Sequence, residues 1–405
     1  MASKAYIGVN GVARKIKKGY IGVGGVARKI IKAYIGVGGV ARPCWSGGLA
    51  YYGSVTPLSA GVTYPATASI PGYALFAGGE LATGTGIAKY SKTIEAYDRS
   101  LTRVSRSLSN MVNMGTSTTT SLNARAHCSG ASVGGVAIFA GGSYGTSNKV
   151  NDVFSVDTSL VVYRVPSGQH MRYNCDRLAA TSVGNYVLFA NGLGVSESGA
   201  APARNDFVEA YSTSLTKYSP QIANTEYSAS YRAATTVGDL ALIAGGGRGT
   251  AGTTYVDVVD VYDSSLTKNS NSSLSVARHM LTATTVNNRG LFAGGTRDGD
   301  RQSVVDSFDT SATRTTISPL SQARNNAYAV TINGAALFLG GEVSSSTRSS
   351  VVDAYDGSLT HTTPQPLAEG RYNHGVAVVG AFVVVAGGTT DSSSYASSAE
   401  AYVYS

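Results

Sequence analysis

Arginine and histidine residues recur at a nearly fixed distance before a pair of glycines in this chain, and their N–H groups could bind a polar ligand. Four arginines lie sixteen positions before the first residue of such a pair: Arg125, Arg278, Arg324 and Arg371. Near the same register lie two further arginines, Arg177 and Arg232, and three histidines, His127, His279 and His374. A guanidinium group in this place can contact a ligand, or it can donate to loop carbonyls and hold neighbouring repeats in register. The sequence leaves both interpretations open.

No catalytic or metal-binding motif accompanies these residues. The chain contains no GxSxG, HExxH, P-loop or CxxC pattern. A copper site would need two histidines and two tyrosines that converge, and no motif here supports such a cluster. Asp298 and Asp300, in the stretch TRDGDRQS, lack the later glutamate of a calcium-binding loop. We therefore expect no enzymatic activity, no metal and no cofactor.

The glycine pairs belong to a repeat that fills most of the chain. The first residues of the seven pairs are Gly78, Gly141, Asn191, Gly245, Gly294, Gly340 and Gly387. Each pair closes an apolar strand such as YALFAGG, and a polar loop then leads to a strand ending in an aromatic–acid step such as VVDVYD. Another strand precedes the apolar strand, and a further one follows a tight SLT turn after the aromatic–acid step. Each unit therefore reads as four antiparallel strands, A to D, in which B ends in the glycine pair. Four strands in ~45–50 residues are typical of one β-propeller blade, so we predict an all-β, seven-bladed propeller over residues 46–405.

Composition agrees with this fold class. Only 14% of the 405 residues are charged and 49 are glycine, which is typical of a turn-rich β protein. Cys44, Cys128 and Cys175 form neither a disulfide framework nor a zinc spacing, which favours a reducing compartment. We expect no signal peptide and no membrane insertion, because no stretch approaches the ~20 apolar residues that span a bilayer.

The repeats resemble kelch repeats of the galactose-oxidase type, whose mark is a di-glycine closing one strand and a tyrosine near the end of the next. The aromatic place is filled by Tyr97, Tyr211, Tyr262, Tyr355 and Tyr402, with Phe308 as a substitute. Val156 departs from the pattern, Asn191 replaces a glycine, and the usual kelch tryptophan is absent. The resemblance covers about residues 50–405. In kelch proteins, arginines in this place often line the ligand-binding mouth. The resemblance implies the same role for the six arginines named above.

The seventh repeat ends after its third strand, at EAYVYS. The stretch LAYYGSVTPLSAG, before the first repeat, resembles fourth-strand text elsewhere. We therefore expect residues ~49–58 to supply the outer strand of the last blade and close the ring.

Strand order divides the loops between two faces. The tight A–B and C–D turns share one face, and the long B–C loops share the other with the D–A connections. The B–C loops vary in length and sequence while the strands stay alike, which is typical of a recognition surface on a fixed scaffold. Arg297, Asp298 and Arg301 lie in one such loop and are further candidates for the ligand face. Tyr144, Tyr255 and Tyr395 could stack on a glycan.

Residues 1–45 form a different segment, which we call the arm. The phrase YIGV–(N/G)G–VAR occurs three times, with equivalent tyrosines and arginines at Tyr6, Tyr20, Tyr34, Arg14, Arg28 and Arg42. Each copy reads as a hairpin with an Asn-Gly or Gly-Gly turn. Residues 1–42 carry nine Lys or Arg and no acid, while the formal charge of the whole chain is +8. Binding of nucleic acid is an alternative, but the charge is spread through a β repeat and the propeller adds nothing positive.

The arm also resembles the N-terminal segments of tail and baseplate structural proteins from phages of Gram-positive bacteria. The resemblance implies a virion protein, made in the bacterial host cytoplasm. Its arm would attach to other tail or baseplate proteins or form a homo-oligomer, and its propeller would bind a host surface glycan or protein. Alternatives are a non-adhesive virion structural or decoration protein, and a galactose-oxidase-like or carbohydrate-binding propeller.

Overall fold

The computed structural model describes residues 48–109, 111–113, 119–120, 124–145, 148–166, 168–195, 206–218, 222–248, 254–269, 272–391 and 394–404, together with the backbone of six strands within residues 6–46. The fold is all-β, as predicted, and the described residues contain one short 3-10 helix, η1 (Gly86–Lys89). No helix in this part of the chain has the length and apolar character needed to cross a membrane.

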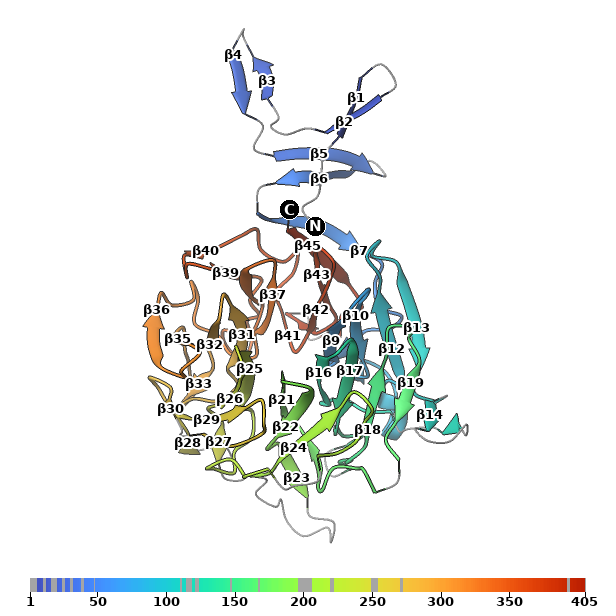
Figure 1. Ribbon diagram of the computed structural model, residues 1–405. Coiled ribbons are helices and arrows are strands. Elements are labelled where there is room, and N and C mark those ends of the chain that lie inside the picture. Colours follow the sequence, from blue (N-terminus) through green and yellow to red (C-terminus); the bar gives the residue numbers. More distant parts are fainter. Residues whose placement is uncertain are drawn as a thin grey trace.

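Seven antiparallel blades surround a central channel, which confirms the predicted architecture (Figure 1). The inner A strands are β9 (Ala66–Ile70), β16 (Ser129–Val133), β21 (Ala179–Val183), β25 (Ala233–Val237), β31 (Thr282–Val286), β37 (Tyr328–Ile332) and β42 (Gly375–Val379). The B strands are β10 (Tyr73–Ala77), β17 (Val136–Ala140), β22 (Tyr186–Ala190), β26 (Leu240–Ala244), β32 (Arg289–Ala293), β38 (Ala335–Leu339) and β43 (Phe382–Ala386). The C strands are β12 (Thr93–Tyr97), β18 (Val153–Val156), β24 (Val208–Ser212), β29 (Val258–Asp263), β35 (Val305–Phe308), β39 (Val352–Asp356) and β45 (Ala399–Tyr404).

The outer D strands are shorter and more varied. They are β13 (Arg103–Ser107), β19 (Val162–Arg164), β30 (Ser272–Ser273), β36 (Arg314–Ile317), β40 (His361–Thr362) and β7 (Leu49–Val55). In the third blade this edge is an isolated bridge between Tyr211 and Lys217. The second blade carries two more strands at its edge, β14 (Met111–Asn113) and β15 (Thr119–Thr120), which belong to the longest interval between glycine pairs.

The ring closes through β7, which precedes the first blade in sequence but pairs with β45 in the last (Figure 1). Leu49 lies opposite Tyr404, and Val55 lies opposite Ala399. Because Ala399 follows a B–C loop, Val55 lies toward the face that carries the B–C loops and the D–A connections. We call this the loop face. Leu49 lies at the opposite face, the turn face, so the chain enters the propeller there.

The B strands are apolar along most of their length because neighbouring blades cover both sides of each sheet. In β17, Ala137, Ile138, Phe139 and Ala140 are all completely buried. The A strands instead alternate, as in β21, whose pattern is buried at every second residue. Their partly exposed positions line the channel with hydroxyl groups, and hydroxyl bonds join successive blades in the pairs Thr181–Thr236, Thr235–Thr285 and Thr284–Thr331.

The first glycine of each pair is needed because the next blade lies against its backbone. Gly294 has φ 65°, a left-handed conformation, and a Cβ added there would lie 2.5 Å from the carbonyl oxygen of Arg324. The neighbouring amide of Gly295 donates to this same carbonyl at 3.0 Å. Asn191 takes the left-handed conformation in its blade with φ 59°, which asparagine tolerates better than most residues.

Short two-stranded ribbons cover the loop face. They are β8 (Val62–Thr63) with β11 (Glu80–Leu81), β20 (Asn174–Asp176) with β23 (Leu193–Val195), β27 (Gly247–Arg248) with β28 (Thr254–Tyr255), β33 (Thr296–Arg297) with β34 (Asp300–Arg301), and β41 (Arg371–Tyr372) with β44 (Thr389–Thr390). All but two of them join a D–A connection to the start of a B–C loop, so the two kinds of segment form one layer.

The arm contains three separate hairpins, β1 (Tyr6–Val9) with β2 (Val12–Lys15), β3 (Tyr20–Val23) with β4 (Val26–Lys29), and β5 (Lys32–Val37) with β6 (Val40–Ser46). In the register, Ile7 pairs with Arg14, Ile21 with Arg28 and Ile35 with Arg42. The side chains proposed for attachment lie outside the described residues: Tyr6, Arg14, Tyr20, Arg28, Tyr34 and Arg42.

Candidate functional site

Five of the six candidate arginines form ion pairs inside a blade. The pairs are Arg125–Asp152 at 3.1 Å, Arg232–Asp260 at 2.7 Å, Arg278–Asp306 at 2.9 Å, Arg324–Asp353 at 2.6 Å and Arg371–Glu400 at 3.3 Å. The side chains of these arginines are at most 1% exposed. Each guanidinium group also donates to strand carbonyls of its own blade, as Arg278 does to Phe292 and Gly294. We call this arrangement the blade lock.

The blade lock corrects the expectation that these five arginines contact a ligand. Their terminal nitrogens bond to a carboxylate and to backbone oxygens, because a buried guanidinium group must find such partners to offset its loss of hydration. The sequence left open a second interpretation, in which the arginines bond loop carbonyls and hold neighbouring repeats in register. The observed bonds instead run to the B and C strands of each arginine's own blade.

The carboxylates of the blade lock occupy a fixed place that the sequence analysis did not single out. Four of them lie two residues before the aromatic position: Asp260, Asp306, Asp353 and Glu400. Glu95 and Glu209 occupy the same place in the two blades that lack the arginine. All of them are buried. In the second blade Asp152 serves instead, from just before β18, and pairs with both Arg125 and Arg164. Burial raises the pKa of Asp152, but the two guanidinium groups outweigh it and hold this pKa below its usual value.

A second ring of residues faces the channel on the loop face. Seven residues with a left-handed backbone lie fourteen positions before the first residue of each glycine pair: Tyr64, His127, Arg177, Tyr231, Met280, Asn326 and Asn373. Backbone bonds join neighbours in this ring, from Tyr64 to Asn373, Arg177 to His127, Met280 to Tyr231, and Asn326 to Met280. We call these residues the mouth ring. The backbone conformation and these bonds fix where their side chains begin.

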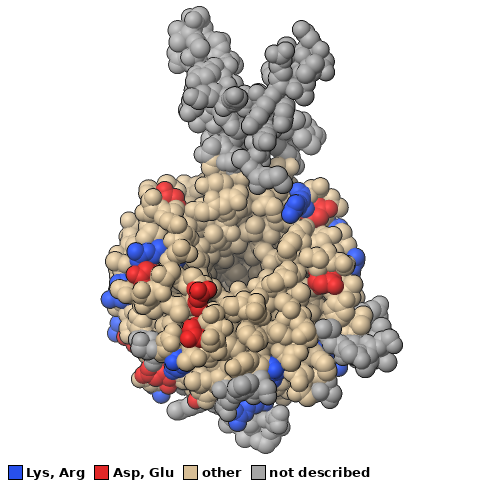
Figure 2. All heavy atoms as spheres, viewed as in Figure 1, with Lys and Arg blue, Asp and Glu red and all other residues tan. Residues whose placement is uncertain are grey.

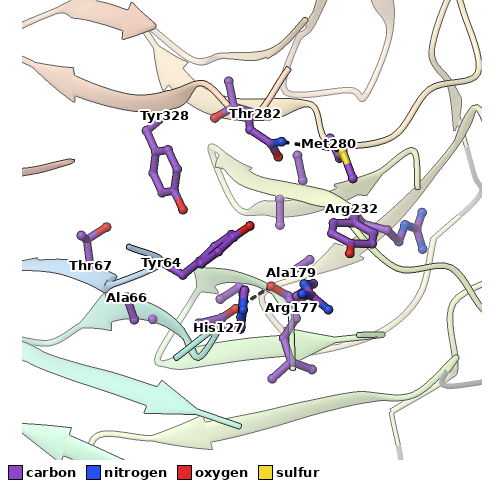
Figure 3. Close-up of a pocket in the computed structure, with 18 of the residues that line it drawn as sticks. Tyr64, Ala66, Thr67, His127, Arg177, Ala179, Arg232, Met280, Thr282 and Tyr328 are labelled. Carbon is purple, nitrogen blue, oxygen red and sulfur yellow. Dashed lines mark hydrogen bonds between the residues drawn. The ribbon is translucent and has the colours of Figure 1, made fainter. Parts of the chain in front are cut away.

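All seven members of the mouth ring line one cavity of about 300 Å³. Figure 3 shows the rings of Tyr64 and Tyr328 beside this space, with His127 and Arg177 on the side of Tyr64. The ring centres of Tyr64 and His127 lie 3.9 Å apart, and the Arg177 guanidinium lies 5.2 Å from the centre of the Tyr231 ring. Figure 3 shows the guanidinium of Arg232 pointing away from the cavity. This group donates to Asp260 at 2.7 Å. The volume suits a small polar ligand or one residue of a larger one.

The electrostatic character of the mouth is polar and weakly charged. Burial, together with the nearby Arg177 guanidinium, lowers the pKa of His127 to about 3, so this imidazole is neutral at ordinary pH. Burial also raises the pKa of Tyr64, which stays a hydroxyl donor. Arg177 is 26% exposed at its side chain and lies 3.7 Å from Asp176. Figure 2 shows the channel open at the centre of the ring on the face that is in view, with acidic and basic residues scattered around it.

The other two candidate histidines lie outside the cavity. His374 is completely buried beside Tyr328, with ring centres 5.0 Å apart, so it is not available to a ligand. Burial and Arg371 lower the pKa of His374 to about 3. His279 packs against Tyr255, with ring centres 5.0 Å apart, and burial and Arg301 lower its pKa.

The candidate residues of the fifth B–C loop lie on the β33–β34 ribbon. Arg297 and Asp298 form an exposed ion pair at 3.2 Å, and Asp298 has φ 51°. Arg301 reaches the next blade and pairs with Glu342 at 3.0 Å. Arg297 and Asp298 are thus free to meet a partner, whereas Arg301 joins two neighbouring loops.

Sequence reasoning found two members of the mouth ring, His127 and Arg177, and missed the others. The available signal was the constant spacing of fourteen residues before each glycine pair. This signal was hidden because the side chains at the seven positions differ in type. Among the described residues, no three His, Cys, Asp or Glu side chains gather closely enough to hold a metal ion.

Fold and site together define a seven-bladed β-propeller with a ligand-sized opening on its loop face. No family model matches the sequence. No curated protein matches it either. Among solved structures, that of the protein YjhT is similar, with a TM-score of 0.56 and 12% sequence identity over 77% of this chain and 99% of that chain. At this identity the likeness shows the fold alone.

Proposed function

We propose that this chain is a receptor-binding protein of a phage tail or baseplate, or of a phage-derived particle, built on a kelch-type propeller. Its arm attaches to other particle proteins or joins copies of the chain, and the loop face binds the host cell surface. The phage assignment rests on the resemblance of the arm repeat. In this proposal the propeller binds and does not catalyse, and the protein belongs to the virion.

One observation supports this division of labour more than any other. Through β7 the chain enters the propeller at the turn face, where Leu49 pairs with Tyr404. The mouth ring and the B–C loops lie on the opposite face, because each A strand begins there. An attachment segment on one side and a variable recognition surface on the other is the polarity that an adhesin needs.

A glycan of the host surface is the ligand class that the mouth suits best. Tyrosine rings offer stacking area for a sugar, and phenol, amide and guanidinium groups offer hydrogen bonds. The mouth ring provides Tyr64 and Tyr231 for the first role and Arg177, Asn326 and Asn373 for the second. Low charge at the rim favours a polyhydroxylated ligand over a highly charged polymer such as nucleic acid.

Deleting residues 1–45 tests the proposal. The shortened chain keeps β7, so it should stay folded and bind host cells, and it should fail to join assembled particles. Unchanged incorporation into particles would contradict attachment through the arm. As a matched control, deletion of residues 1–55 removes β7 as well and exposes the edge of β45, so we expect lower stability and aggregation.

Replacing Arg297 and Asp298 by serine separates an adhesin from a decoration protein. Both side chains are exposed, so the fold should not change. Host-cell binding should decrease if the loop face meets the receptor. If this variant and variants of the mouth ring all bound cells as well as the native chain does, the non-adhesive alternative would be favoured.

A further inference from the structure

The first blade lacks the arginine of the blade lock but keeps its backbone setting. Val62 lies sixteen positions before Gly78, the same spacing as Arg278 before Gly294. The Val62 amide donates to Ala396 O, as the Arg125 amide donates to Ser91 O one blade later. The Val62 carbonyl accepts from the second glycine of the preceding pair, as the Arg125 carbonyl does. Val62 therefore stands where the other blades begin their buried arginine.

The acceptors of the missing guanidinium group are present in the first blade. In the fifth blade, Arg278 donates to Gly294 O at 2.9 Å, to Phe292 O at 3.1 Å and to Asp306 at 2.9 Å. The corresponding groups of the first blade are the carbonyls of Gly78 and Phe76 and the carboxylate of Glu95. In the seventh blade Arg371 also uses the carbonyl of Ser398, whose counterpart is Thr93.

A cavity of about 490 Å³ occupies the place of the missing arginine. Phe76, Gly78, Thr93 and Glu95 all line it. The rest of its wall is largely apolar and includes Leu58, Val62, Leu81 and Ile87, with Lys92 as a cationic member. Ile87 is 49% exposed, so this wall reaches the surface. The third blade also lacks the arginine, but there Cys175 packs in a cluster with Met171 and Phe207.

The charges around Glu95 leave room for one more cation. Asp306 accepts from Arg278, from Arg314 at 3.3 Å and from the amide of Ser275. Glu95 has the last two kinds of partner, Arg103 at 3.3 Å and the amide of Ser59, and it also accepts from the hydroxyls of Ser59 and Ser105. A guanidinium group placed in the cavity would give Glu95 two arginine partners, as Asp306 has, with Lys92 as a further cation in the wall.

We propose that this cavity binds the guanidinium group of an arginine side chain presented by another protein segment. The carboxylate of Glu95 and the carbonyls of Phe76, Gly78 and Thr93 receive its five donors, and the apolar wall packs the alkyl stem. Two sources can present such a group, the arm of a second copy of this chain or a foreign protein. The site lies beside the first blade and does not depend on the function proposed for the mouth.

Calorimetric titration of the full chain with N-acetyl-arginine amide tests the site. The citrulline analogue has the same shape without the charge, so it should bind at least about tenfold more weakly. Glu95→Gln should weaken arginine binding by a similar factor. Equal affinity for the two compounds would overturn the proposal. So would a lack of binding both by the native chain and by a variant with Arg14, Arg28 and Arg42 changed to serine, in which these arm arginines cannot fill the cavity.

Val62→Arg provides a second test, because it ties a guanidinium group into the cavity. We expect this variant to lose binding of the free compound and to unfold at a higher temperature than the native chain. Val62→Met adds length without charge and should not raise the unfolding temperature as far. A folded Val62→Arg protein that still binds the arginine compound as the native chain does would contradict the assignment.

Sedimentation velocity separates the two sources. If the arm of a second copy fills the cavity, the native chain should form oligomers that the arginine compound dissociates and Val62→Arg prevents. If the source is foreign, the arginine compound should bind without changing the sedimentation coefficient.

Discussion

Arg278 and Asp306 form an ion pair of 2.9 Å in which both side chains are completely buried. Burial lowers the pKa of Arg278, and the Asp306 carboxylate acts against this shift. The same pairing occurs in the next blade between Arg324 and Asp353. Each pair joins a D–A connection to a C strand, so it fixes the loop face onto the sheet below.

Removing one partner of such a pair should destabilise the propeller strongly. Arg278→Met leaves the Asp306 carboxylate buried with fewer donors, and we expect a loss of roughly 3–5 kcal/mol in the free energy of unfolding. Urea unfolding monitored by circular dichroism measures this change. The control Arg297→Met removes an exposed arginine of the same blade and should stay within about 0.5 kcal/mol of the native value. Equal stability of the two variants would contradict the structural role of the blade lock.

The glycine pair offers a second test of how blades meet. Gly294→Ala places a Cβ 2.5 Å from the Arg324 carbonyl, whereas Gly299 has open space around the same position. Both glycines have positive φ, so each change carries backbone strain of roughly 1–2 kcal/mol. Gly294→Ala should lose about 1–3 kcal/mol more, because the clash forces two blades apart. Thermal unfolding of the two variants gives the comparison, and equal losses would mean that φ alone explains the glycine.

The blade count and strand order could be predicted because each blade repeats one packing problem. An apolar strand, a left-handed glycine and an aromatic residue must recur wherever blade meets blade, so the sequence period is visible. Even Asn191, an exception to the glycine pattern, has the left-handed conformation that its type suggests.

The roles of the arginines could not be predicted from their spacing alone. A guanidinium group at the start of an A strand can turn outward or inward, and the direction depends on a carboxylate about 28 residues later in the chain, as Asp306 is for Arg278. Two blades also shift one partner, so that Asp152 and Arg232 break the simple pattern. The mouth ring was hidden for a different reason, because its backbone geometry is constant while its side chains vary.

Glycine is the matched substitution for testing the mouth ring. Arg177 has φ 56° and Tyr231 has φ 57°, so Arg177→Gly and Tyr231→Gly remove a side chain without disturbing the left-handed backbone. We expect both variants to lose at least about tenfold in affinity for host cells or isolated surface glycan, while their unfolding temperatures stay close to the native value. Asn288→Gly is the control, since Asn288 has φ 57° in an A–B turn on the opposite face. Unchanged binding by both mouth variants would exclude the mouth as the recognition site.

Buried histidines should make stability depend on pH below neutrality. The pKa values of His127 and His374 are lowered from 6.5 to about 3 in the folded chain, mainly by burial. Between these two pH values the unfolded chain binds more protons than the folded one. The contribution of these two histidines to the free energy of unfolding should therefore be constant above pH 6.5. It should fall as the pH decreases toward 3, by up to about 1.4 kcal/mol per pH unit for each histidine.

Variants that cannot titrate should remove this slope. His127→Asn keeps a residue that tolerates the left-handed backbone, and His374→Phe keeps a ring against Tyr328. Urea unfolding at a series of pH values should show a smaller loss of stability between pH 6.5 and 4.5 in the double variant than in the native chain. Protonation of the blade-lock carboxylates Asp152 and Asp353 affects stability in a lower pH range. Their pKa values are lowered in the folded chain, so their contribution to the free energy of unfolding changes only below about pH 4. If the double variant kept the native slope in the upper window, neutral burial of the two histidines would be wrong.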